Sequence, residues 1–151
     1  MNAQSQPPRY IEPNRSARIF NATVGQLTKM GISVYGSRVL AVRGRKSGEW
    51  RTTPVNPLTI DGQRYLISPR GNTQWVRNMR VAGGGELRIG RRVEKFTATE
   101  LPIEERPAVL RAYLKKWKFE VGVFFQGVGP DATEEKMLAI APDHPVFRIR
   151  S

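Results

Sequence analysis

Two short stretches hold most of the residues whose types and spacing could do chemistry. The first covers residues 43–54 and combines four basic residues, three hydroxyls and a two-glycine turn, in the order Arg-Gly-Arg-Lys-Ser-Gly-Glu-Trp-Arg-Thr-Thr-Pro. Glycines let backbone N–H groups approach a ligand closely, and arginine makes bidentate contacts with phosphate or carboxylate. This stretch therefore predicts a site for an anion.

The second stretch covers residues 68–80 and reads Ser-Pro-Arg-Gly-Asn-Thr-Gln-Trp-Val-Arg-Asn-Met-Arg. A strand is predicted to end and a helix to begin within it, and a helix N-terminus favours an anion. Taken alone, each stretch has the alternative of a basic hairpin or a solvated helix face. Together they favour a ligand site, because such sites gather convergent polar groups.

Side chains able to catalyse by themselves are scarce. The chain has no cysteine, and its one histidine, His144, has no second histidine with which to share a metal. No metal site is therefore expected, and His144 is predicted to be a turn residue. Five carboxylates lie in a predicted turn or at predicted helix starts, namely Asp61, Glu104, Glu105, Glu134 and Glu135. With no strong nucleophile, metal set or carboxylate pair, an enzyme of this sequence needs a cofactor to supply its reactivity.

The overall charge is strongly basic and limits the classes of partner. Lys and Arg number 25 against 13 Asp and Glu, giving a formal net charge of +12. Such a field attracts nucleic acid, anionic lipid or a small ligand that carries phosphates and carboxylates. No segment is predicted to span a bilayer or to act as a signal peptide, so a cytoplasmic location is expected.

The pattern of elements predicts a mainly β protein of the α+β class. A mobile arm is expected over residues 1–14, and one domain over 15–151 that starts with a helix at 15–32. Strands are predicted at 39–42, 49–60, 64–68, 86–89, 92–101 and 146–149, and helices at 73–82, 103–120 and 134–141. Asp61-Gly62 is a hairpin signal, and the three glycines at 83–85 predict a flexible break. Five or six short strands with hairpin connections and flanking helices indicate an antiparallel barrel or a strongly curved sheet.

The two basic stretches resemble the coenzyme-binding segments of the deazaflavin-dependent nitroreductase family. The likeness rests on Gly-Arg-Lys-Ser-Gly at 44–48, Arg-Thr-Thr-Pro-Val at 51–55, and Trp75-x-x-Asn78-x-Arg80 preceded by Ser68 and Gly71. It extends over residues 40–101. Members have a split β-barrel fold and bind coenzyme F-420, a relative of flavin with a phosphate-linked oligoglutamate tail.

The resemblance implies a role for each matching residue. The phosphate and tail would be held by Arg45, Lys46 and Ser47, with Arg51 nearby. The deazaflavin ring would lie along Thr53, Pro54 and Val55. The ring or tail would be bordered by Ser68, Pro69, Arg70 and Gly71, and the pocket completed by Trp75, Asn78 and Arg80.

The resemblance also implies a reaction, in which a hydride passes from the reduced deazaflavin to an electrophilic acceptor. Quinones, conjugated enones or esters, and nitroaromatics are the acceptor types of the family. Tyr113 is a candidate proton donor, although its place in the apolar stripe Leu110, Tyr113, Leu114 and Trp117 favours a core position. Trp117, Phe124 and Phe125 either wall the acceptor side or pack. The sequence departs from better-known members between residues 113 and 125, where the choice of acceptor is expected to be set.

Three other functions are compatible with the sequence. A split barrel can also serve flavin mononucleotide (FMN), and a basic barrel with three tryptophans can bind nucleic acid without enzymatic activity. The helix at 15–32, together with the basic surface, would suit weak peripheral contact with anionic lipid. The oligomeric state is expected to be a monomer or a homodimer.

Overall fold

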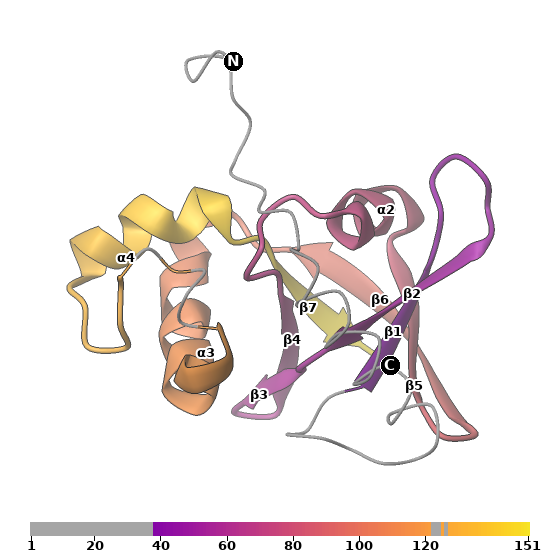
Figure 1. Ribbon diagram of the computed structural model, residues 1–151, viewed down its shortest axis with the longest axis horizontal. Helices are drawn as coiled ribbons and strands as arrows, with labels where there is room; N and C mark the ends of the chain where they lie inside the picture. The colour runs from indigo at the N-terminus through magenta and orange to yellow at the C-terminus, as the bar shows by residue number, and fades with distance from the viewer. Residues whose placement is uncertain (1–37, 122–124, 126) are drawn as a thin grey trace.

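The computed structural model describes residues 38–121, 125 and 127–151, and its centre is one antiparallel sheet (Figure 1). The sheet strands are β1 Arg38–Arg43, β2 Trp50–Val55, β3 Leu58–Ile60, β4 Gln63–Ile67, β5 Gly84–Ile89, β6 Arg92–Glu100 and β7 Val146–Arg150. The helices are α2 Gln74–Ala82, α3 Arg106–Val121 and α4 Glu134–Ile140, with 3-10 turns η2 Ile103–Glu105 and η4 Ala141–Asp143. The predicted arm at 1–14 and helix at 15–32 lie outside the described residues.

The sheet must curl because its two edges are neighbours in the sequence. The strand order is β2-β1-β5-β6-β7-β4-β3, so β2 and β3 form opposite edges. Only Asn56 and Pro57 separate the end of β2 at Val55 from the start of β3 at Leu58. Three Cα-to-Cα steps reach at most about 11 Å, so the two edges lie close together and the sheet folds into a barrel split between them.

The connections before and after β3 follow from the residues that form them. The predicted single strand at 49–60 is two strands, because it is interrupted at Asn56-Pro57. The predicted hairpin at Asp61-Gly62 is confirmed: Ile60 pairs with Gln63, and both turn residues have positive φ, at 49° and 80°. Positive φ at both positions is the requirement of a tight two-residue hairpin turn.

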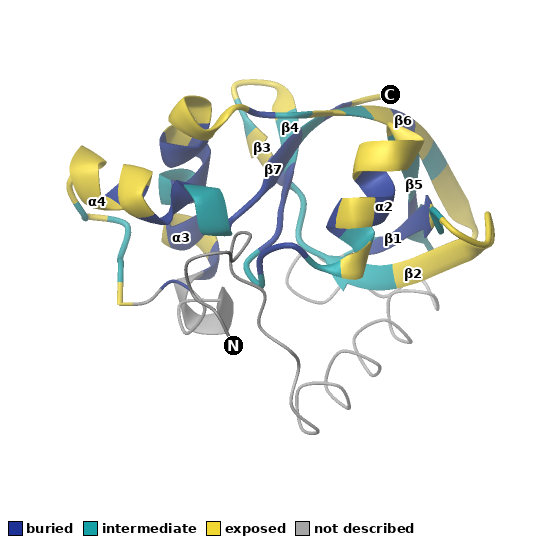
Figure 2. Ribbon diagram, turned by 90° about the horizontal axis from the view of Figure 1, so that it is seen from above, coloured by how far each residue is buried: buried dark blue, intermediate teal, exposed yellow. Residues whose placement is uncertain are grey.

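The inner face of the barrel forms one hydrophobic core together with α2. Leu40 pairs with Leu87 and Ala98 pairs with Ile149, so these side chains share a face of the sheet. The buried members of this core are Leu40, Val42, Leu66, Val76, Met79, Leu87, Phe96, Phe147 and Ile149. Helix α2 supplies Val76 and Met79 to it, and in Figure 2 the helix lies beside β1 and β2. The predicted helix at 73–82 is therefore confirmed, with Thr73 as its N-cap.

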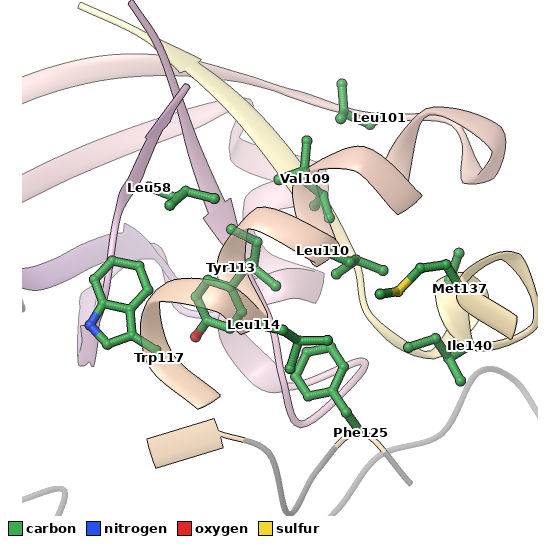
Figure 3. Packing of buried hydrophobic residues seen from close by; sticks show 13 residues of the cluster. Leu58, Leu101, Val109, Leu110, Tyr113, Leu114, Trp117, Phe125, Met137 and Ile140 are labelled. Atoms are coloured by element: carbon green, nitrogen blue, oxygen red, sulfur yellow. The ribbon is translucent and has the colours of Figure 1, made fainter. Parts of the chain in front are cut away.

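A second core joins α3 and α4 to the other end of the sheet. The predicted stripe Leu110, Tyr113, Leu114 and Trp117 is buried, together with Leu58 of β3 and Met137 and Ile140 of α4 (Figure 3). His144 follows η4 and stacks on Phe125, with ring centroids 4.1 Å apart. Helix α3 is kinked at Trp117, whose φ and ψ of −126° and 30° are not helical. Within the described residues no helix is both long and apolar enough to cross a membrane.

The prediction of a flexible break at residues 83–85 was wrong. Gly83 ends α2 with a φ of 71°, and Gly84 and Gly85 already belong to β5. A Cβ at Gly84 would lie 2.3 Å from the carbonyl oxygen of Phe96, and one at Gly85 would lie 2.4 Å from that of Ala41. The glycines are therefore needed because neighbouring strands pass too close for a side chain.

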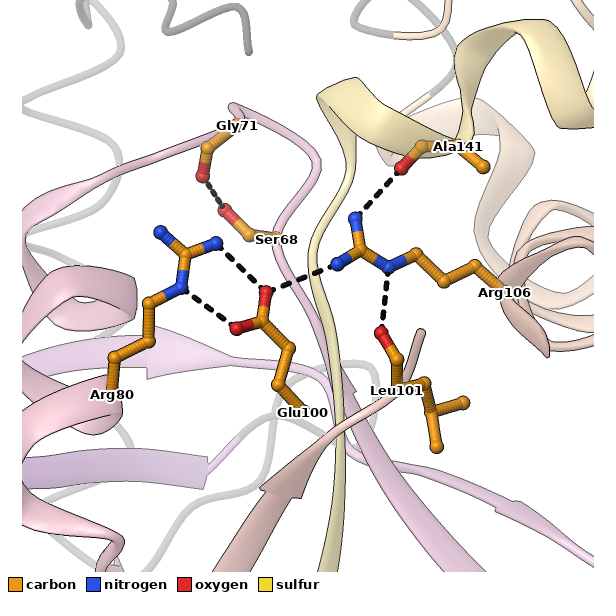
Figure 4. Close-up of polar contacts among 7 residues, drawn as sticks. All are labelled: Ser68, Gly71, Arg80, Glu100, Leu101, Arg106 and Ala141. Carbon is orange, nitrogen blue, oxygen red and sulfur yellow. Dashed lines mark hydrogen bonds and ion pairs between the residues drawn. The ribbon is translucent and has the colours of Figure 1, made fainter. Parts of the chain in front are cut away.

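A bridging carboxylate ties α2 to α3 across the end of β6. Glu100 receives a bidentate pair of hydrogen bonds from Arg80, at 2.8 and 2.7 Å, and a third from Arg106 at 3.1 Å (Figure 4). Arg106 also donates to the carbonyls of Leu101 and Ala141. Burial lowers the pKa of Arg106, and the charge of Glu100 opposes that shift. Glu100 is thus the counter-charge that offsets the cost of burying the Arg106 guanidinium.

Substituting Gly85→Ala is expected to lower the free energy of unfolding by about 1–3 kcal/mol, because the added methyl group must displace the β1 backbone. Chemical denaturation of the purified variants measures the change. Gly129→Ala is the matched control, since a Cβ there meets nothing within 4 Å. Equal stabilities for the two variants would contradict the close approach of β1 and β5.

Substituting Glu100→Gln is expected to lower the free energy of unfolding by about 1–3 kcal/mol, because two arginines lose a charged hydrogen-bond acceptor. Glu135→Gln is a suitable control, since that carboxylate is exposed in the first turn of α4. If thermal unfolding gives the same midpoint for both variants, the Glu100 bridge does not stabilise the fold.

Candidate functional site

The loop between β1 and β2, residues 44–49, is a compact hydrogen-bonded turn. The backbone N–H of Gly44 donates to the carbonyl of Glu49, and that of Gly48 donates to Gly44, both at 2.8 Å. Gly48 has a φ of 74°, which favours glycine. The hydroxyl oxygen of Ser47 accepts a hydrogen bond from the N–H of Glu49 at 3.2 Å. The basic motif seen in the sequence is thus a shaped loop and not a loose connection.

This loop is held on helix α2 by Arg45. The backbone N–H of Arg45 donates to Oδ1 of Asn78 at 3.0 Å, and Nη1 of Arg45 donates to the same oxygen at 2.8 Å. Nη1 also donates to Oε1 of Gln74 at 2.9 Å. Gln74 and Asn78 are four residues apart, so both lie on the side of α2 that meets the loop. The two basic stretches of the sequence are therefore brought together in space.

Three further cations lie in this loop or on the two elements beside it, and their side chains have no partner among the described residues. Lys46 lies in the loop, Arg51 lies near the start of β2, and Arg77 lies on α2 one turn from Gln74. All three are exposed, and their side chains make no hydrogen bond or ion pair with other described residues. A cation without an acidic partner is available to an anionic ligand.

The segment that enters α2 holds buried polar atoms without partners. Ser68 is buried and its hydroxyl donates to the carbonyl of Gly71 at 2.6 Å, which closes a turn (Figure 4). Oδ1 of Asn72 and Oγ1 of Thr73 are buried and accept no hydrogen bond from the part of the chain that the structure describes. Thr73 makes no side-chain cap, and the first turn of α2 has no acidic residue. Buried polar atoms of this kind normally have partners, so they fit a polar ligand at this helix start.

Strand β2 presents alternate side chains to this side of the sheet. Arg51 pairs with Val42 and Thr53 pairs with Leu40, and both partners belong to the barrel core. Val55, next in the same alternation, packs against that core. Arg51, Thr53 and Val55 therefore share the face that α2 covers.

A family model matches residues 12–125, and its description is F420H(2)-dependent quinone reductase. The chain belongs to this family. The protein is accordingly an oxidoreductase whose hydride donor is reduced coenzyme F-420, as the sequence resemblance implied.

Solved structures with this fold share little sequence with the chain. A structure described as an F420-H2 dependent reductase, FDR-A, is 19% identical with a TM-score of 0.53, covering 76% of this chain and 94% of its own. A structure described as a domain-swapped dimer is 18% identical with a TM-score of 0.56, covering 90% and 94%. A conserved hypothetical protein from Mycobacterium tuberculosis is 15% identical with a TM-score of 0.52, covering 97% and 86%. These likenesses confirm the predicted split barrel with flanking helices, and no curated protein matches the sequence significantly.

Several residues implied by the resemblance lie away from the docked loop of this F-420-dependent reductase. Arg80 is two residues from Asn78, about 200° around α2, and its guanidinium is paired with Glu100. Pro54 pairs with Val39 and so lies on the opposite face of β2 from Thr53 and Val55. Trp75 packs against the barrel core, with its ring centroid 5.8 Å from that of Phe147.

The candidate proton donor Tyr113 lies inside the second core. Its side chain is 2% exposed, and its ring contacts those of Trp117 and Phe125 at centroid distances of 5.4 and 6.3 Å. This is the core position that the helical stripe predicted as the alternative. Trp117 and Phe125 are buried with it, whereas Phe124 lies outside the described residues.

Four polar residues near the loop were not singled out from the sequence, namely Asn72, Thr73, Gln74 and Arg77. Gln74 had a usable signal, because its spacing of four from Asn78 puts both amides on one side of the helix. Arg77 had the same kind of signal at a spacing of three. Asn72 and Thr73 had none, since only the folded structure shows that their oxygens are buried without partners.

Proposed function

We propose that the protein reduces a small electrophilic acceptor, a quinone in the first instance, and that the loop at 44–49 docked on α2 binds the anionic part of coenzyme F-420. Conjugated enones or esters and nitroaromatics are acceptors of the same electrophilic class. The observation that carries the proposal is the hydrogen-bonded contact of Arg45 with Gln74 and Asn78, which holds the loop that contains Lys46 on the helix that contains Arg77.

The residues present suit such a coenzyme. Phosphate and oligoglutamate carry several negative charges, and Lys46, Arg51 and Arg77 offer three positive charges without acidic partners. The heterocycle of the coenzyme has polar atoms on its ring, and Asn72 and Thr73 hold buried oxygens without partners. Charged hydrogen bonds of this kind contribute about 1.5–3 kcal/mol each, so three cations are enough to dominate the affinity.

The remaining residues would orient the ring. Thr53 and Val55 lie on the face of β2 next to α2, and the turn closed by Ser68 and Gly71 fixes where that helix begins. Ser47, Pro69 and Arg70 would border the coenzyme in this region. When bound, the reduced coenzyme supplies a hydride to the acceptor. The protein's part is then placement and exclusion of water, which agrees with its shortage of catalytic acids and bases.

Anaerobic mixing with reduced F-420 and menadione tests this function, with the absorbance of oxidised F-420 as the readout. The wild-type protein is expected to oxidise the coenzyme in a saturable way. Lys46→Met is expected to raise the KM for the coenzyme about tenfold and to leave kcat at saturating coenzyme within about twofold, because Lys46 contributes binding equally in the ground state and the transition state.

Lys115→Met is the control, since Lys115 is an exposed lysine on α3. No oxidation with menadione, a conjugated enone or a nitroaromatic would contradict the proposed reaction. An equal rise in KM for both lysine variants would show that general positive charge, and not the loop, attracts the coenzyme.

A further inference from the structure

Arg45 has a bonding pattern unlike that of the cations around it. Both hydrogens of its Nη1 atom are used inside the protein, one on Oε1 of Gln74 and one on Oδ1 of Asn78. Its backbone N–H uses the same Asn78 oxygen. Lys46, the next residue in the chain, makes no such bond.

We infer that Arg45 is a positioning residue, and that Asn78 is the hydrogen-bond acceptor that fixes the loop at 44–49 on α2. Direct contact with the phosphate then falls to the side chain of Lys46 and to the backbone N–H groups of Lys46 and Ser47, which the hydrogen bonds of the turn do not use. The part of this inference that concerns the coenzyme rests on the proposed function. The contact between Arg45 and Asn78, called the clamp below, does not depend on it. The resemblance assigned Arg45 to the phosphate, so the inference gives this residue a different task.

The burial of Asn78 makes the clamp specific. Asn78 is 4% exposed, and its side-chain oxygen accepts two hydrogen bonds that join residues 33 positions apart. Replacing Asn78 by Leu leaves the backbone N–H of Arg45 without its acceptor, and replacing Arg45 by Met leaves the Asn78 oxygen with that backbone N–H alone, so each change weakens the same contact. Residues 46–49 of the loop are exposed, and the hydrogen bond from Arg43 to the carbonyl of Gly48 stays within the same hairpin. Among the described residues, the hydrogen bonds that hold the loop on α2 are those of Arg45 with Gln74 and Asn78.

A direct ligand and a clamp predict different salt dependence. A cation that touches the anionic coenzyme loses affinity as salt screens the charge, so removing it reduces the slope of log Kd against log salt. A clamp acts through geometry, so removing its neutral half, Asn78, weakens binding without changing that slope. Hydrogen exchange of the loop amides without coenzyme reports the clamp separately.

The experiment compares Arg45→Met, Asn78→Leu, the double variant and Lys46→Met by fluorescence titration with oxidised F-420 at several salt concentrations. Arg45→Met and Asn78→Leu are each expected to raise Kd about tenfold, with faster exchange of the amides at 44–49, and Asn78→Leu, which removes no charge, is expected to leave the salt slope unchanged. The double variant is expected to be at most about threefold weaker than Asn78→Leu, because Asn78→Leu leaves only the bond from Arg45 to Gln74 for the second change to break. Lys46→Met is expected to reduce the slope and to leave loop exchange unchanged.

A reduced salt slope for Arg45→Met, with normal loop exchange, would overturn the inference and make Arg45 a phosphate ligand. Gln74→Ala keeps the test usable if Asn78→Leu does not fold, since Gln74 is exposed and offers only one of the two acceptors. It is expected to raise Kd about threefold and to speed loop exchange. A wild-type protein that does not bind F-420 would contradict the proposed function, while the exchange data would still decide whether the clamp exists.

Discussion

The two-residue connection between β2 and β3 is the constraint on which the rest of the structure depends. Because Asn56 and Pro57 join strands at opposite edges of the sheet, the sheet must curl until those edges meet. Curling encloses one apolar face, and α2 covers that face with Val76 and Met79. The close passage of β1, β5 and β6 follows from the same curvature and explains why Gly84 and Gly85 have no side chains.

The position of α2 then creates the site. Its inner side is buried in the barrel, and Gln74 and Asn78 on another side receive Arg45 from the β1–β2 loop. On the far side, Arg80 meets Glu100, which also holds Arg106 at the start of α3. One short helix is thus connected to the β1–β2 loop through Gln74 and Asn78, and to the α3–α4 end of the molecule through Arg80.

Local signals predicted much of the fold and the two basic stretches that the structure brings together in the candidate site. Asp61-Gly62, the stripe from Leu110 to Trp117 and the helix starting after Thr73 depend on nearby residues, so they could be predicted from the sequence. Gly84 and Gly85 could not, because the carbonyls that exclude a side chain belong to other strands. The partners of Arg45 lie 29 and 33 residues away, so its sequence motif indicated a cation in this loop without revealing which side chains it contacts.

The basic loop on α2 is expected to bind a deazaflavin and not an ordinary flavin. Titration of the purified protein with oxidised F-420, with FMN in parallel, tests it most directly through the change in ligand fluorescence. Saturable binding of F-420, much tighter than that of FMN, is the predicted result, because the anionic oligoglutamate tail adds charges that Lys46, Arg51 and Arg77 can meet. Tighter binding of FMN, or binding of neither, would contradict it.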